Sequence, residues 1–169
     1  MLDSKTIVEK LQLKPHPEGG FFIEVYRSNE ILNSGSLPKR YLSDRNISTS
    51  IYYLLENKQF SAFHKLKSDE TWHFYFGSSL LLHVIDENRN YKKIILGNDF
   101  TNGEVFQVTV LRNNWFAAEV SDKDSFSLIG ATVAPGFDFN DFEMGERDKL
   151  INNFPEQENL ITRLTRIEK

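Results

Sequence analysis

Short runs of alternating apolar and polar residues dominate the chain from residue 21 to residue 134. Alternation with a period of two is typical of strands that bury one face. Clusters of Gly, Asn, Asp and Ser separate the runs and favour turns. The runs predict strands at 21–28, 48–56, 59–66, 71–77, 80–86, 91–96, 105–111, 115–120 and 126–134. Since no helical pattern intervenes, the arrangement indicates an antiparallel barrel or sandwich.

Helical patterns lie at the two ends of this β-rich region. An apolar stripe with a helical period predicts a helix over 4–13, which Pro15 ends because proline lacks a backbone donor. Helical patterns return over 145–166, after Pro135 has broken the last strand. We therefore predict one domain, 1–169, with a barrel over about 20–134 and helical termini.

Composition narrows the class of protein. With 20 basic and 24 acidic residues the formal charge is −4, so no basic surface is expected for nucleic acid or an anionic membrane. The absence of cysteine excludes disulfides, thiolate catalysis and cysteine-based zinc sites. No apolar stretch suits a signal peptide or a membrane span, which predicts a cytoplasmic protein. Fourteen Phe, six Tyr and two Trp favour a β-rich core or a lined pocket.

Residues 63–77, FHKLKSDETWHFYFG, concentrate the candidate chemistry. His64, Glu70 and Gly77 have the spacing of the first motif of the cupin superfamily, which this stretch resembles. The slot for a second histidine holds Leu66, and the histidine slot of the second cupin motif holds Phe116. Only His64 and Glu70 therefore remain from the usual set of three histidines and one glutamate.

A wider resemblance covers nearly the whole chain. The segments HPEGGFF, STSIYYLL, FHKLKSDETWHFYFG and ATVAPGFDFNDFE, together with Arg27, look like a small cupin family formerly treated as a domain of unknown function. The resemblance implies a mainly β double-stranded β-helix, the jelly-roll barrel, similar in shape to dTDP-4-dehydrorhamnose 3,5-epimerase and germin-like proteins. It also implies a homodimer, and pairing would cover the exposed strand edges of such a barrel.

The ligand count argues against a metal site. A catalytic transition metal usually needs at least three protein ligands, and Leu66 and Phe116 supply none. His73 lies on the opposite face of the strand from Glu70 unless a bulge turns it inward. We therefore expect no cofactor, and a divalent transition metal at His64 and Glu70 is the weaker interpretation. A hydrogen-bonded His–Glu pair that only satisfies itself is a further alternative.

A metal-free use fits the residues better. His64 beside the carboxylate of Glu70 can serve as a general base, and the epimerase resemblance implies a histidine base with a tyrosine acid. The tyrosine candidates are Tyr26, Tyr52, Tyr53 and Tyr75. The first hypothesis is a metal-independent isomerase or epimerase acting on a sugar-like ligand. The alternatives are a non-catalytic small-molecule-binding cupin and, less favoured, a metal-dependent cupin enzyme.

Several residues are candidates to line the pocket beside His64 and Glu70. The candidate ligand-binding residues are Arg27, Tyr53, Trp72, His73 and Trp115. Simpler explanations fit the others. His16 and the PEGG sequence after it are expected to form an exposed turn, and His83 is expected to face solvent or a dimer partner. Arg45 is expected to stay solvated or to contact an anionic ligand, and the acidic run Asp138, Asp141 and Glu143 is expected to form a solvated loop.

Overall fold

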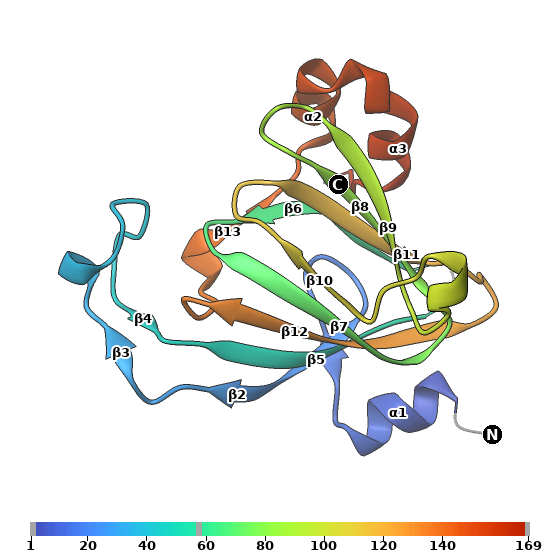
Figure 1. The fold of residues 1–169 in the computed structure, drawn as a ribbon, viewed down its shortest axis with the longest axis horizontal. Helices are drawn as coiled ribbons and strands as arrows, with labels where there is room; N and C mark the ends of the chain where they lie inside the picture. The colour runs from blue at the N-terminus through green and yellow to red at the C-terminus, as the bar shows by residue number, and fades with distance from the viewer. Residues whose placement is uncertain (1–2, 57–58, 168–169) are drawn as a thin grey trace.

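The computed structural model describes residues 3–56 and 59–167, which form two facing antiparallel sheets (Figure 1). One sheet has the order β1-β2-β5-β12-β7-β10, formed by Lys14–Pro15, Phe21–Arg27, Thr49–Glu56, Phe126–Ala134, Asp69–Gly77 and Gln107–Val110. The other has the order β13-β6-β11-β8-β9, formed by Phe142–Met144, Phe60–Leu66, Trp115–Val120, Leu80–Ile85 and Tyr91–Leu96. A short two-stranded sheet pairs β3, Ile31–Leu32, with β4, Arg45–Asn46.

The predicted mainly β fold is confirmed. Each of the predicted strands is present with bounds that agree within two residues. Helices lie at both ends, as expected: α1 covers Ser4–Lys10, α2 covers Arg147–Asn153 and α3 covers Glu158–Arg163. Asp3 caps α1, because its side chain accepts the Thr6 amide.

Alternation along each strand divides the apolar residues between the barrel interior and its outer faces. Positions two apart on the strands, such as Ile129, Ala131 and Val133 of β12, belong to the interior cluster. The outer face of the five-stranded sheet packs Phe63, Ile85 and Ala117 against α2 and α3 (Figure 1). The outer face of the six-stranded sheet packs in part against α1. The helices therefore cover apolar surface outside the barrel and leave its interior to the strands.

Two segments outside the main strands reach the open part of the barrel. Residues 15–20 form a loop before β2, and residues 135–144 return after β12 so that β13 pairs with β6. Arg45 holds the returning segment through a bidentate ion pair with Asp141, at 2.6 and 2.7 Å, and both side chains are buried. Among residues 3–56 and 59–167, no helix has the length and apolarity needed to cross a membrane.

Candidate functional site

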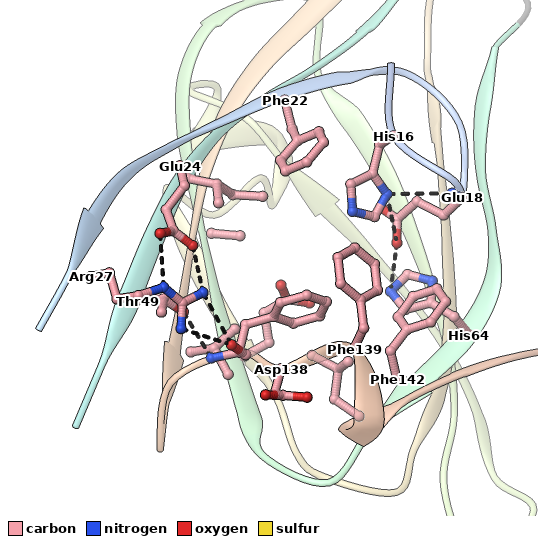
Figure 2. Close-up of a pocket in the computed structure, with 16 residues that line it drawn as sticks. His16, Glu18, Phe22, Glu24, Arg27, Thr49, His64, Asp138, Phe139 and Phe142 are labelled. Atoms are coloured by element: carbon pink, nitrogen blue, oxygen red, sulfur yellow. Dashed lines mark hydrogen bonds and ion pairs between the residues drawn. The ribbon is translucent and has the colours of Figure 1, made fainter. Parts of the chain in front are cut away.

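A cavity of about 270 Å³ lies between the two sheets (Figure 2). Apolar side chains form most of its wall: Phe22, Ile51, Leu66, Ala131, Val133, Phe137, Phe139 and Phe142. Figure 2 shows His16, Glu18 and His64 grouped at one side of the cavity, and Glu24 with Arg27 at the opposite side. His64 is 2% exposed, whereas the side chains of Glu24 and Arg27 are 38% and 39% exposed. The cavity therefore has a buried histidine end and an open end.

His64 is paired with Glu18, and both side chains are buried. Nε2 of His64 lies 3.1 Å from Oε2 of Glu18, and Nδ1 lies 2.7 Å from the Ala62 carbonyl oxygen. Because a carbonyl only accepts, Nδ1 carries a proton, and Nε2 faces the Glu18 carboxylate. The expected His64–Glu70 pair is replaced by His64–Glu18. Both ring nitrogens of His64 are thus engaged with protein atoms, and its role becomes that of a positioning residue.

His16 lines the cavity and is not an exposed turn residue as the sequence suggested. Its side chain is 7% exposed, and its ring packs edge-on against Phe22 at 4.6 Å between centroids. Nδ1 accepts the backbone amide of Glu18 at 3.3 Å, so Nδ1 has no proton to give to Oε2 of Glu18, 3.7 Å away. Burial lowers the pKa of His16. The ring is therefore neutral with its proton on Nε2, which points into the cavity (Figure 2).

Glu70, the other predicted catalytic residue, also lines the cavity. Burial is the main cause that raises the pKa of Glu70 to about 8, and the charge of Glu18 adds to it. The indole of Trp72 donates to Oε2 of Glu70 at 2.9 Å and lowers that pKa in part. At neutral pH the Glu70 carboxyl is therefore protonated and can donate a hydrogen bond to a ligand.

Arg27, a predicted ligand-binding residue, lines the open end. Its guanidinium makes a bidentate pair with Glu24 at 2.9 and 2.7 Å. The remaining donors reach the side chain of Asn46 at 2.8 Å and the Phe137 carbonyl at 3.3 Å. All five N–H groups of Arg27 are thus directed at protein acceptors. Arg27 shapes the open end of the cavity and keeps no donor for a ligand.

Two further predicted ligand-binding residues lie behind the cavity wall. Tyr53 is 2% exposed, and its hydroxyl donates to the Gly19 carbonyl at 2.8 Å. Trp72 is 2% exposed and belongs to the interior core. Neither lines the cavity, but each supports a part of it. Tyr53 holds the loop that carries Glu18, and Trp72 holds Glu70.

The last two predicted ligand-binding residues lie on outer faces. His73 lies between the inward residues Trp72 and Phe74, and its Nε2 is 3.3 Å from the hydroxyl of Thr132 outside the barrel. Trp115 packs in the cluster under α2 and α3 and carries the Lys65 ammonium over its ring at 4.5 Å. Its neighbour Phe116 faces inward, opposite His64, with 4.1 Å between ring centroids. Adjacent strand residues face opposite sides, so Phe116 excludes Trp115 from the pocket.

Three polar residues have partners that the sequence did not indicate. His83 is 3% exposed and lies between Tyr91 and Glu119, at 2.9 and 3.3 Å, so it does not face solvent. The buried Asp141 binds Arg45, so neither of them is solvated. Asp138, from the same acidic run as Asp141, lines the cavity.

The side chains at the expected metal position do not fit a metal ion. Leu66 and Phe116 stand in the histidine slots, and Nε2 of His64 is directed at Glu18. Within the described part of the chain, no three His, Asp or Glu side chains are arranged to hold a metal.

The loop that carries His16 and Glu18 is the part of the site that sequence reasoning missed. Glu18 accepts from Ser61 at 2.9 Å in addition to its contact with His64, and its backbone carbonyl accepts the Ala62 amide at 2.9 Å. These bonds fix the loop against β6. The sequence did contain one indication of this role. Two titratable residues, His16 and Glu18, lie among prolines and glycines, and a simple turn does not require them.

Two facing antiparallel sheets that enclose a cavity, with a histidine and a glutamate from consecutive strands lining it, are typical of a cupin. A family model described as "Cupin superfamily (DUF985)" matches residues 5–145, and the chain belongs to this family. An uncharacterised protein of Saccharomyces cerevisiae is 32% identical over 148 residues, which cover 80% of this chain and 71% of that protein.

Solved structures agree with this assignment. A crystal structure of a Shewanella oneidensis protein has a TM-score of 0.90 and 33% identity, and the match covers 99% of this chain and all of that one. A hypothetical protein from Leishmania major has a TM-score of 0.86 and 32% identity, over 98% of this chain and 100% of that one. Oxalate decarboxylase from Bacillus subtilis has a TM-score of 0.55 and 14% identity, over 92% of this chain and 37% of that one, which shows the shared fold alone.

Proposed function

We propose that this cupin binds a small, carbohydrate-like molecule in the cavity between its sheets, without a metal. The observation that carries the proposal is that two neutral hydrogen-bond donors and an aromatic wall belong to the same cavity. Nε2–H of His16 and the protonated carboxyl of Glu70 belong to the same cavity as four Phe rings. Ligand sites typically combine an apolar lining with a few placed polar groups.

The two donors suit an oxygen of the ligand. A hydroxyl or carbonyl oxygen accepts hydrogen bonds from an imidazole N–H and from a carboxylic acid. Both donors are buried, so their bonds to a ligand do not compete with bulk water. A ligand that left either donor without an acceptor would lose binding free energy. The Phe rings supply flat apolar faces for the carbon skeleton. Glu18, His64 and Ser61 hold the His16 loop in place and are positioning residues in this proposal.

A thermal-shift screen against sugars and polyols, followed by calorimetric titration of the compounds that stabilise the protein, tests this function. We expect Glu70→Leu to weaken binding by about tenfold, since a lost hydrogen bond costs roughly 1 kcal/mol or more. Glu70→Gln keeps an N–H donor and should bind within a few-fold of wild type, and the exposed Glu156→Gln is the matched control. Equal affinities for wild type and Glu70→Leu would contradict the site.

A second candidate function is an isomerase or epimerase, and the raised pKa of Glu70 favours it. A carboxyl that holds its proton at neutral pH can act as a general acid. No tyrosine among the described residues lines the cavity, so Glu70 would replace the tyrosine acid, and the Glu18 carboxylate in the same cavity would take the proton that the ligand loses. Incorporation of deuterium from solvent into a bound ligand, lost in Glu70→Gln, would support this reaction. Binding without exchange would favour the non-catalytic function.

The homodimer stays a prediction of the family resemblance. The sheet edges formed by β9 and β10 end the two sheets of the described chain, and sedimentation velocity would give the mass in solution.

A further inference from the structure

Each acidic side chain that lines the cavity has a side-chain partner in the protein, with one exception. Glu24 pairs with Arg27 through two hydrogen bonds. Glu18 is held by Ser61 and His64, and Glu70 accepts from the indole of Trp72. Asp138 also lines the cavity, and no ion pair within 4.0 Å reaches its carboxylate from the part of the chain that the structure describes.

Asp138 is held in place but keeps acceptor capacity. Its Oδ1 accepts the backbone amide of Asn140 at 2.8 Å, which caps the short 3-10 helix of residues 139–141. A carboxylate has about four acceptor positions, so this bond leaves most of them for a ligand. Because the side chain is half-buried, its charge acts in a medium that screens less than bulk water.

Aromatic rings line the same cavity as this carboxylate. Phe137 and Phe139 flank Asp138 in the chain and contact each other edge-on at 5.0 Å, and Phe139 contacts Phe142 at 6.2 Å. Figure 2 shows Asp138 close to Phe139, on the side of the cavity away from Glu18. The face of a ring attracts a cation, and a nearby carboxylate adds to that attraction. An anion placed here would meet the same ring faces and the carboxylate of Asp138, while Arg27 is already paired with Glu24 and keeps no free donor for it.

We propose that the cavity selects a ligand that carries a positively charged amino group, which lies between the Asp138 carboxylate and the rings of Phe137 and Phe139. This inference rests on the proposed function, since it specifies the carbohydrate-like ligand as an amino sugar. The oxygen-bearing part of the ligand then faces His16 and Glu70. Anionic sugars such as hexuronates and sugar phosphates are expected to bind more weakly, because the Asp138 carboxylate repels them.

The experiment compares matched ligands with the same carbon skeleton by calorimetric titration. The probes are hexosamines, the corresponding neutral hexoses, N-acetylhexosamines and hexuronates. We expect the hexosamine to bind about tenfold more tightly than the neutral hexose, since its ammonium group gains both a cation–π contact and an ion pair. Raising the salt concentration should reduce this preference, because salt screens a half-exposed pair.

Asp138→Asn provides the specific variant, because asparagine keeps the cap on the Asn140 amide and removes only the charge. It should bind the hexosamine and the neutral hexose within about threefold of each other, since one charge pair is lost. Asp124→Asn, at an exposed turn position, is the matched control and should keep the wild-type preference.

The outcomes separate this inference from the proposed function. Equal affinity of wild type for hexosamine and neutral hexose, or tighter binding of the hexuronate, would overturn the amino-group selection and leave the carbohydrate site standing. An unchanged preference in Asp138→Asn would overturn the role of this carboxylate. Stabilisation by none of the probes would overturn the carbohydrate-like ligand itself and this inference with it.

Discussion

Nε2 of His64 lies 3.1 Å from Oε2 of Glu18, and this pair joins a core strand to a loop that precedes the barrel. The same Glu18 acts at a distance on Glu70, because its charge raises the Glu70 pKa. The three residues therefore form one electrostatic unit at the buried end of the cavity, although only two of them belong to the cupin motif.

The first prediction concerns the pKa of Glu70. Glu18→Gln removes a nearby negative charge, so the Glu70 pKa should fall below its value of about 8 while burial keeps it above 4.5. Trp72→Phe removes a donor to the carboxylate form and should raise the same pKa. Titration followed by carbon-13 NMR of the Glu70 carboxyl measures both. A Glu70 pKa that is identical in wild type and Glu18→Gln would rule out this coupling.

The second prediction concerns how stability depends on pH. The native protein keeps a proton on Glu70 up to about pH 8, whereas the unfolded chain releases it near 4.5. Between these two values the unfolded state binds fewer protons, so the Glu70 contribution to the free energy of unfolding falls as pH rises. Glu70→Gln should therefore become more stable relative to wild type across this window.

Urea denaturation at several pH values measures that difference. Glu9→Gln, on the exposed side of α1, is the control, and its difference from wild type should stay constant. A difference for Glu70→Gln that stays flat from pH 4.5 to pH 8 would show that Glu70 is ionised in the native state.

The third prediction concerns the buried pair of Arg45 and Asp141. Asp141→Ala leaves the buried guanidinium without its partner and should lower the free energy of unfolding by about 3–5 kcal/mol. Lys149→Ala breaks an exposed pair with Glu146 and should have a much smaller effect. Urea denaturation of both variants makes the comparison, and similar losses in the two would refute the structural role of Asp141.

The fourth prediction concerns Gly20, at the end of the loop that carries Glu18. Gly20 has φ +69°, and a Cβ there would lie 2.5 Å from the Leu54 carbonyl oxygen. Gly103 also has a positive φ, +83°, but a Cβ there would meet no atom within 4 Å. Gly20→Ala should therefore cost about 1–3 kcal/mol more than Gly103→Ala, since both share the backbone strain and only one clashes. Equal thermal midpoints would contradict the clash.

Strand positions were predictable because periodicity reports which residues are buried. The pattern placed β5, β6, β11 and β12 within one residue of their ends. The spacing of the cupin motif singled out His64 and Glu70, and both line the cavity. The same alternation also predicts that Trp115 lies on the outer face of its strand. Once Phe116 is assigned to the inward histidine slot, its neighbour must face outward.

The partners of the site could not be predicted, because they come from segments without periodicity. Glu18 and Asp138 lie in irregular loops, where sequence spacing gives no direction for a side chain. His83 is buried because Tyr91 and Arg163 close over Glu119 beside it, and the docking of α3 onto the sheet is a tertiary event. Local patterns predict faces of strands, whereas these contacts depend on how distant segments meet.

The loop that presents His16 and Glu18 also bears on the order in which the molecule acquires its site. The Glu18 carbonyl accepts a hydrogen bond from Arg166 at 2.9 Å in addition to the Ala62 amide. An early segment of the chain is thus held by a residue that a ribosome adds long after the barrel strands. A nascent chain can pair its strands before Arg166 emerges, but it cannot yet hold this loop through both bonds. The proposed binding site should accordingly be completed late in synthesis, after the barrel itself has closed.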